Sequence, residues 1–232
     1  MDSLSVFILA GGLGTRLRAV SGERPKGLMS VGGQPFLQRL LERLVAQNLH
    51  ECALCLGYGA QSISNYFAEH PVRDMALHLS IEAEPRGTAG ALRVAQACWA
   101  EQNLILNGDT EIAFDFQSFF DDHRTKQGAV TIGLAQVDDA ARYGRVLLGD
   151  GGRVNAFLEK DGEQRGGLVN AGVYLATYHA LGQIPAQGQV SIEHGWLPDL
   201  LRRDFSLYGV VIAAEFTDIG APEDYWRLAN RA

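Results

Sequence analysis

Three glycines and an arginine follow a short apolar run near the start of the 232-residue chain. The apolar run, residues 6–10, reads as a buried strand, and Gly11-Gly12-Leu13-Gly14-Thr15-Arg16 comes directly after it. Glycines let a backbone turn sharply and approach a ligand closely, because no Cβ stands in the way. Backbone N–H groups in such a loop can converge on an anion, and an arginine can make forked bonds to phosphate oxygens. The stretch predicts a cradle for nucleotide phosphates.

This loop differs from two other phosphate-binding loops. A dinucleotide fingerprint needs G-x-G-x-x-G, and Leu17 stands where the third glycine would be. The chain has no Gly-Lys-Ser/Thr, so it has no Walker loop. The glycine pattern therefore argues against a nicotinamide-dependent dehydrogenase. A purely structural turn after an edge strand stays open as an alternative.

Two further residues could act on phosphates. Lys26 follows Pro25 and carries a compact positive charge, although most lysines are simply solvated. Asp109 comes directly after the apolar strand that ends at Leu106-Asn107-Gly108. Mg²⁺ is typically held by one or two carboxylates together with substrate phosphates, so Asp109 is a candidate magnesium ligand. An aspartate in this position could instead cap a helix.

The elements that must position these residues alternate between strands and helices. Strands are expected over 6–10, 51–56, 76–82 and 103–106, and helices over 34–48, 60–67 and 88–100. This alternation predicts an α/β fold, with a Rossmann-like, mostly parallel central sheet and helices on both faces. Ligands bind such sheets beyond the carboxyl ends of the strands. The glycine loop, Gly57, Gly87 and residues 107–109 all fall at such ends.

The alternation loosens after Asp109. The pattern predicts a helix over 114–127, a strand over 129–135, a hairpin of 144–148 with 153–158, and a strand over 168–176. Hexapeptide repeats that would extend the C-terminus as a β-helix are absent from the sequence.

Composition and charge argue against several classes of protein. The formal net charge is −7 and no basic run exists, which argues against a nucleic-acid binder. Neither a signal peptide nor an eighteen-residue apolar stretch occurs, so we expect a cytoplasmic protein without membrane contact. Cys52 and Cys55 form C-x-x-C on a predicted strand, where residues three apart point to opposite faces. We therefore expect core cysteines and no metal site there.

Several motifs, in one order, resemble those of the sugar-1-phosphate nucleotidyltransferases, also called NDP-sugar pyrophosphorylases. They are L-A-G-G-L-G-T-R-L at 9–17, P-K-G-L at 25–28, G-Q-P-F-L at 33–37, E-P-R-G-T-A-G-A-L at 84–92 and F-T-D-I-G-A-P-E-D-Y at 216–225. The resemblance covers nearly the whole chain. It implies the nucleotide-diphospho-sugar transferase fold, which is GT-A-like, as a single domain over 1–232. About 1–110 would bind the nucleotide, and about 111–232 the sugar phosphate.

The resemblance also implies a reaction, in which an NTP and a sugar 1-phosphate give an NDP-sugar and pyrophosphate. The implied catalytic residues are Arg16, Lys26 and Asp109. The implied nucleotide-binding residues are Leu9, Ala10, Gly11, Gly12, Gly14, Thr15, Arg16, Lys26, Gly87, Thr88 and Asn107. The implied sugar-phosphate residues are Gly144, Glu159, Lys160, Asn170 and Gly172. The implied Mg²⁺ ligands are Asp109 and Asp218.

Several of these residues have simpler interpretations. Thr88 could cap the helix that follows it, Glu159 and Lys160 could be a solvated pair, and Asn170 could be a turn residue. Glu223 and Asp224, just after Pro222, suit the first turn of a helix. Ser191 is expected to cap a helix, and His194 has no obvious catalytic partner.

Within the family, the short length and the two end motifs most resemble D-glycero-α-D-manno-heptose-1-phosphate guanylyltransferases, which would make GTP the nucleotide. Mannose-1-phosphate guanylyltransferases and muramate-1-phosphate uridylyltransferases are similar alternatives. Arg86 and Ala221 depart from the family pattern, and Arg86 leaves the base preference open. A non-catalytic nucleotide-sugar-sensing module is the alternative of another class. A homo-oligomer is compatible with the sequence.

Overall fold

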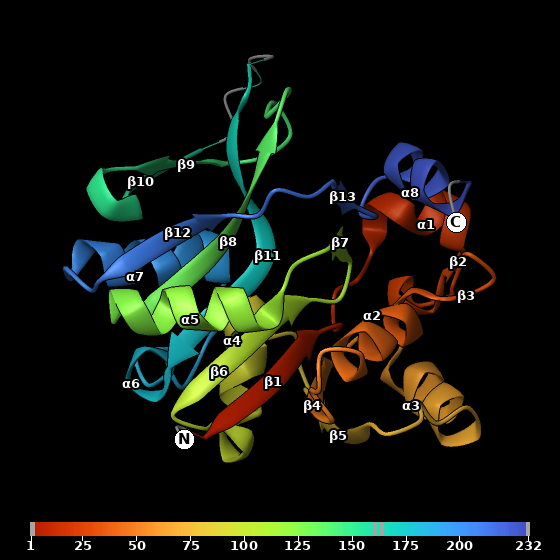
Figure 1. The fold of residues 1–232 in the computed structure, drawn as a ribbon. Helices are drawn as coiled ribbons and strands as arrows, with labels where there is room; N and C mark the ends of the chain where they lie inside the picture. The colour runs from red at the N-terminus through yellow and green to blue at the C-terminus, as the bar shows by residue number, and fades with distance from the viewer. Residues whose placement is uncertain (1–2, 160–161, 163–164, 231–232) are drawn as a thin grey trace.

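A computed structural model gives the fold, and it describes residues 3–159, 162 and 165–230. One sheet of nine strands runs through the molecule in the order β10-β9-β11-β6-β1-β4-β5, with β8 paired to β11 and β12 paired to β8 (Figure 1). Its strands are β1 (Leu4–Leu9), β4 (Glu51–Leu56), β5 (Ala76–Ile81), β6 (Gln102–Asn107), β8 (Val130–Val137), β9 (Arg145–Leu148), β10 (Val154–Leu158), β11 (Gly167–Thr177) and β12 (Leu207–Val211).

The parallel part of the sheet is built from the first half of the chain. β1 pairs in parallel with both β4 and β6, and β4 pairs in parallel with β5. Leu9 at the end of β1 stands opposite Asn107 of β6 and Cys55 of β4, so the loops that follow these strands leave from one edge. β1 is thus a central strand, and the interpretation of the glycine loop as a turn after an edge strand is wrong.

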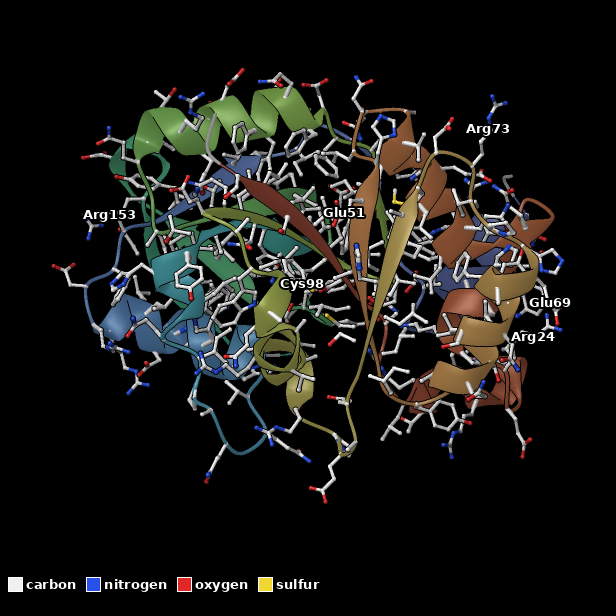
Figure 2. All side chains as sticks on the ribbon, turned by 90° about the horizontal axis from the view of Figure 1, so that it is seen from below. Arg24, Glu51, Glu69, Arg73, Cys98 and Arg153 are labelled. Carbon is white, nitrogen blue, oxygen red and sulfur yellow. The ribbon has the colours of Figure 1, made fainter. Side chains whose placement is uncertain are left out.

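Helices cover both faces of the sheet, as the strand and helix alternation predicts. One face is packed by α2 (Phe36–Val45), α3 (Ala60–Glu69) and α5 (Phe116–Lys126) through Leu41, Ile63 and Phe119. The other face is packed by α4 (Gly87–Val94), α6 (Tyr178–Leu181) and α7 (Leu197–Arg202), through residues such as Leu92 and Leu200. Figure 2 shows α5 and α4 on opposite sides of β1.

The second half of the chain extends the sheet with antiparallel strands. β11 pairs antiparallel with β6 and β8, and β9 and β10 form the predicted hairpin. β12 pairs in parallel with β8 and was not predicted. The Rossmann-like fold with a parallel core is confirmed.

A small sheet returns the C-terminal part of the chain to the centre. β7 (Thr110–Ile112) follows β6 after a two-residue turn and pairs antiparallel with β13 (Phe216–Asp218). Next comes α8 (Pro222–Ala229), which lies beside α1 (Arg18–Ser21) in Figure 1 although the two come from opposite ends of the chain. A third apolar cluster joins them, because Leu17, Ile219 and Tyr225 are buried together.

Short elements complete the chain. They are the strands β2 (Ser30–Val31) and β3 (Gln34–Pro35), the 3-10 helices η1 (Thr15–Leu17), η2 (Lys26–Leu28), η3 (Gln96–Cys98) and η4 (Asp150–Gly152), and the single π-helical turn η5 (Ile192–Trp196). The helix expected over 88–100 is shorter than predicted: α4 ends at Val94 and the chain continues as η3.

The cysteine pair has no metal-binding geometry. Cys52 and Cys55 are both buried on β4, and they belong to the apolar clusters on opposite faces of the sheet. Burial raises the pKa of both thiols, which keeps them protonated. The expectation of ordinary core cysteines is confirmed. Among the described residues, no helix is long and apolar enough to cross a membrane.

Candidate active site

The glycine loop is held against neighbouring backbone at the carboxyl edge of the sheet. Gly11 packs against the loop after β4, where a Cβ on Gly11 would lie 2.9 Å from the Gly57 nitrogen. Gly14 has φ +57, in the left-handed region that favours glycine, and it precedes η1, which carries Arg16. The loop can therefore bring its backbone close to a ligand while Arg16 stays exposed at its end.

The loop forms one wall of a pocket of about 250 Å³. Of the predicted nucleotide-binding residues, those that line it are Leu9, Ala10, Gly12, Gly14, Thr15, Arg16 and Lys26. Asp109 and Gly220 line the far side. Gly11 is not a lining residue, because it supports the loop from behind.

Three charged side chains meet at the end of this pocket. The Lys26 Nζ lies 2.8 Å from Asp109 Oδ2 and 3.8 Å from Asp218 Oδ1. Residues from η2, from the turn after β6 and from β13 are thus brought to one point. Asp109 begins no helix, since the turn leads into β7, so its interpretation as a helix cap is wrong.

The two carboxylates fit a divalent cation. Burial and the nearby Asp109 charge raise the pKa of Asp218, while Lys26 opposes that rise. Two carboxylates within 4 Å of one cationic nitrogen are close enough to share a metal ion, which would relieve their repulsion. Over the part of the chain that the structure describes, no group of three or more His, Cys, Asp or Glu side chains is placed to hold a metal. Two protein ligands suit Mg²⁺, which takes further ligands from water and phosphates.

A second pocket, of about 340 Å³, adjoins the first. Arg16 and Asp109 line both pockets, and Asp218 lines the larger one. Most of the remaining wall comes from the second half of the chain, with Asn107 and Thr110 from the first half. It includes Arg142, Tyr143, Gly144, Arg145, Phe157, Glu159, Asn170, Glu193, His194 and Phe216. Two ligands, one in each pocket, would therefore meet beside Arg16 and Asp109.

A buried tyrosine supports the floor of the larger pocket. Tyr174 on β11 is fully buried, and its hydroxyl accepts a hydrogen bond from Asn170 Nδ2 at 2.7 Å. Burial raises the pKa of Tyr174 well above its usual value, so the hydroxyl stays neutral. Asn170 Nδ2 also donates to Glu193 Oε1 at 3.0 Å, and its Oδ1 accepts from the Gly172 N–H. These contacts fix which way the Asn170 amide faces.

The rim of the larger pocket is tied to the C-terminal helix. Arg142 Nη2 donates to Asp224 Oδ2 at 2.7 Å, and Asp224 also accepts from Arg227. The Asp224 hydrogen bond raises the pKa of Arg142, which keeps that guanidinium charged at the pocket wall. The first-turn position predicted for Asp224 is confirmed, and its buried carboxylate also holds Arg142.

The loop after β5 lies beyond the smaller pocket. The Glu82 carboxylate sits under the glycine loop, where a Cβ on Gly57 would overlap it, and its Oε2 accepts from the Arg86 N–H at 3.0 Å. Thr88 does not cap α4, contrary to that interpretation: its hydroxyl accepts a hydrogen bond from the Ile192 N–H at 2.8 Å. Thr88 and Gly87 line neither pocket.

The structure gathers most, but not all, of the predicted sugar-phosphate residues. Gly144, Glu159 and Asn170 line the larger pocket, together with Asn107, which was predicted for the nucleotide. Gly172 lies behind the wall, where a Cβ would meet the Asn107 side chain at 2.8 Å. Lys160 lies outside the described residues.

Several wall residues were not predicted as site residues, among them Arg142, Glu193 and His194. Arg142 precedes the quoted Tyr143-Gly144 motif, and its position there was the only sequence signal. Glu193 and His194 follow Ser191, whose role as an N-cap is confirmed because its hydroxyl accepts from the His194 N–H. His194 Nδ1 lies 3.5 Å from Glu159 Oε1 across the pocket.

Comparison with known protein families identifies one match, "Nucleotidyl transferase", over residues 5–232. A D-glycero-alpha-D-manno-heptose 1-phosphate guanylyltransferase of Aneurinibacillus thermoaerophilus is 35% identical over 96% of this chain and 95% of its own. A mannose-1-phosphate guanylyltransferase of Mycobacterium tuberculosis is 32% identical over 97% of this chain, which spans 63% of that protein.

Among solved structures, the crystal structure of HddC from Yersinia pseudotuberculosis is similar to this chain. It superimposes with a TM-score of 0.88 at 34% identity, and the match covers 100% of this chain and 99% of that one. HddC complexed with GMP-PN gives a TM-score of 0.86 at the same identity and coverage.

Proposed function

The chain belongs to the nucleotidyl transferase family, and from that premise we propose that it joins GTP and a sugar 1-phosphate to give a GDP-sugar and pyrophosphate. The preferred sugar is D-glycero-α-D-manno-heptose 1-phosphate. The observation that carries the proposal is the meeting of two pockets at Arg16 and Asp109. A triphosphate in the glycine-loop pocket would place its α-phosphate beside a sugar phosphate in the larger one.

For this reaction the protein needs to align the two substrates and to supply positive charge at their phosphates. A phosphate monoester oxygen is anionic near neutral pH, because the second phosphate pKa is about 6. It can attack the α-phosphorus in line without a general base, and pyrophosphate leaves from the opposite side. Arg16, at the junction, and Lys26, in the nucleotide pocket, supply fixed positive charge where negative charge develops.

A divalent metal is general in this family, and we propose Mg²⁺ as the ion. Asp109 and Asp218 would hold it. When bound, it adds positive charge at the phosphates and fixes their orientation. Lys26, which contacts Asp109 in the structure, would then be free to turn toward a phosphate oxygen.

Similarity to proteins that use guanine nucleotides supports GTP as the nucleotide. The similar HddC structure contains GMP-PN, and the similar relatives act with guanine nucleotides by name.

The larger pocket suits a polyhydroxylated ligand with a phosphate. Asn170, Glu159 and Glu193 offer amide and carboxylate groups for hydroxyls. Arg142 and Arg145 offer positive charge near the junction. The relatives named for heptose 1-phosphate and mannose 1-phosphate support this class of sugar and make mannose 1-phosphate the second candidate. We propose that residues 1–232 act as one catalytic domain in the cytoplasm, where nucleoside triphosphates are available.

The test is pyrophosphate release with Mg²⁺ across four nucleoside triphosphates and a panel of sugar 1-phosphates. The proposal requires release with GTP and heptose or mannose 1-phosphate. Release only with UTP or dTTP would refute the guanine assignment and keep the mechanism. If no pair gives pyrophosphate while GTP still binds, the non-catalytic sensing module replaces the proposal.

A further inference from the structure

The loop after β5 and the start of α4 form backbone hydrogen bonds with a segment that is distant in sequence. Backbone N–H groups of Ala89 and Gly90 both donate to the Val190 carbonyl, at 2.9 and 3.2 Å, and the Val190 N–H donates to the Arg86 carbonyl at 2.8 Å. Gly87 makes the close approach possible, because a Cβ there would lie 2.6 Å from the Val190 oxygen. These backbone hydrogen bonds therefore join the start of α4 to the segment before η5.

The Thr88 side chain completes this connection. Its hydroxyl accepts the Ile192 N–H at 2.8 Å, and Ile192 is the first residue of η5. The N–H groups in the first turn of a helix have no partner within the helix. Thr88 satisfies one of them and Ser191 satisfies another, that of His194, at 3.2 Å. Ile192 is 1% exposed, so water does not replace the threonine easily.

The turn that Thr88 holds carries one wall of the larger pocket. Glu193 and His194 belong to η5, and Leu197 follows at the start of α7; all three line the pocket. Glu193 contacts Asn170 at 3.0 Å, and His194 contacts Glu159 at 3.5 Å. The position of η5 thus sets where these groups face the pocket.

We propose that Thr88 is a positioning residue for the sugar 1-phosphate pocket, although it lies at the start of α4, in the stretch that the family resemblance assigns to the nucleotide. Its hydroxyl fixes the first turn of η5 and, through it, Glu193 and His194. The proposal rests on the proposed function for the identity of the ligand. It gives the Thr88 hydroxyl a role toward the sugar phosphate that the family resemblance does not imply.

A nucleotide role for Thr88 makes a different prediction. A hydroxyl can accept one hydrogen bond and donate another, so Thr88 could contact the nucleotide while it holds Ile192. Thr88→Val removes both abilities and keeps the side-chain shape, whereas Thr88→Ser keeps the hydroxyl. The Michaelis constants for the two substrates then separate the two roles.

The experiment compares Thr88→Val, Thr88→Ser and the matched control Thr177→Val. Thr177 is also a threonine whose hydroxyl accepts a helix N–H, that of Ala180 at 3.2 Å, but it lines neither pocket. We expect Thr88→Val to raise KM for the sugar 1-phosphate roughly tenfold, the scale of one lost hydrogen bond. KM for GTP should stay within about twofold of the wild-type value, because uniform binding of that substrate is untouched. Thr88→Ser should restore the sugar KM.

Three results would overturn the inference. They are an increase in the GTP KM that matches or exceeds the sugar effect, an equal sugar effect in Thr177→Val, or no rescue by serine. Hydrogen exchange at residues 190–196 gives a readout that needs no turnover, with faster exchange expected in Thr88→Val than in Thr88→Ser. Unchanged hydrogen exchange in Thr88→Val would refute the positioning role. Inactivity of the wild-type protein on every substrate pair would instead refute the proposed function, and the exchange measurement would still test the positioning role.

Discussion

At the scale of single residues, the site depends on buried side chains that lie behind the pocket wall and orient the residues that line it. Tyr174 lines neither pocket, yet its hydroxyl bonds Asn170, which lines the larger one. A buried polar group that loses its partner costs about 1–3 kcal/mol, so such a hydroxyl matters for both stability and geometry.

Tyr174→Phe keeps the ring and removes only this hydroxyl. We expect the free energy of unfolding to fall by about 1–3 kcal/mol and KM for the sugar 1-phosphate to rise, since Asn170 loses one of its partners. Urea unfolding and steady-state kinetics measure both effects. Tyr178→Phe, at an exposed tyrosine four positions along the chain, is the control and should leave the sugar KM unchanged. An unchanged sugar KM in Tyr174→Phe would contradict the supporting role.

Lys26 is the cation nearest the two carboxylates. Lys26→Ala should lower kcat by roughly 100- to 1,000-fold, the scale seen when one preorganised charge-stabilising group is removed. Lys26→Arg retains the charge but not the compact shape, so we expect it to recover only part of the rate. Pyrophosphate release at saturating substrates and Mg²⁺ measures kcat. If Lys26→Ala kept a normal kcat and raised only KM, Lys26 would bind the substrate and the transition state equally and would not speed the chemical step.

At the scale of elements, a polar contact holds α5 on the sheet. His123 of α5 is buried, with its Nδ1 2.8 Å from the Thr131 hydroxyl of β8 and its Nε2 2.9 Å from Gln102 Oε1 of β6. Gln102 Oε1 can only accept, so Nε2 carries the proton and Nδ1 accepts from Thr131. Burial lowers the pKa of His123 to about 4, so the folded protein keeps this ring neutral.

This contact predicts a pH dependence of stability. The unfolded state takes up the His123 proton below about pH 6.5, whereas the folded state resists protonation until about pH 4. The contribution of the neutral ring is therefore complete above pH 6.5 and is lost as the pH falls toward 4, by about 3 kcal/mol in all. Urea unfolding of wild type and His123→Gln between pH 7.5 and 4.5 should show a difference that shrinks with acid. His70→Gln, at an exposed histidine, should leave the pH profile unchanged, and a constant difference for His123→Gln would refute the assignment.

At the scale of the whole molecule, η1 and α1 near the start of the chain pack against the C-terminal segment beside the site. β13 supplies Asp218, and α8 packs with α1 behind it. Asp224 of α8 accepts from Arg142, which comes from the second half of the chain and lines the larger pocket. The C-terminal segment therefore acts on both the carboxylate pair and the pocket wall.

Asp224→Asn tests this link. The Asp224 side chain is 4% exposed while its two arginine partners are about half exposed, so we expect a loss of roughly 2 kcal/mol, less than for a fully buried pair. KM for the sugar 1-phosphate should rise, because Arg142 loses its anchor. Asp199→Asn weakens two surface pairs, with Arg202 and Arg203, and should change neither quantity by a comparable amount. Equal stability losses in the two variants would show that the Asp224 contact is an ordinary surface pair.

Much of this architecture follows from local sequence. The apolar runs and helical spacing predicted β1, β4, β5 and β6 and their helices, and the glycines predicted the tight loop after β1. Asp218 lies over a hundred residues from Asp109, and only the family resemblance paired them. The antiparallel pairing of β7 with β13, which brings them together, leaves no periodic signal in three-residue strands.

Other contacts were beyond sequence reasoning because they depend on tertiary geometry. Thr88 stands at a position that suits a helix cap, but its hydroxyl faces Ile192, over a hundred residues away in sequence. Glu193 follows a recognised capping serine, yet its place in the pocket depends on the π-helical turn of η5. Such turns give no sequence pattern comparable to the spacing of an α-helix.

The most direct test of the central claim is the turnover of Asp109→Ala with GTP, heptose 1-phosphate and saturating Mg²⁺. Asp109 is the carboxylate that both pockets share, and it is one of the two proposed metal ligands. We expect pyrophosphate release to fall by at least about 1,000-fold, while Asp115→Ala, which removes an exposed carboxylate at the start of α5, keeps the wild-type rate. A near-normal rate in Asp109→Ala would show that phosphoryl transfer does not take place where the two pockets meet.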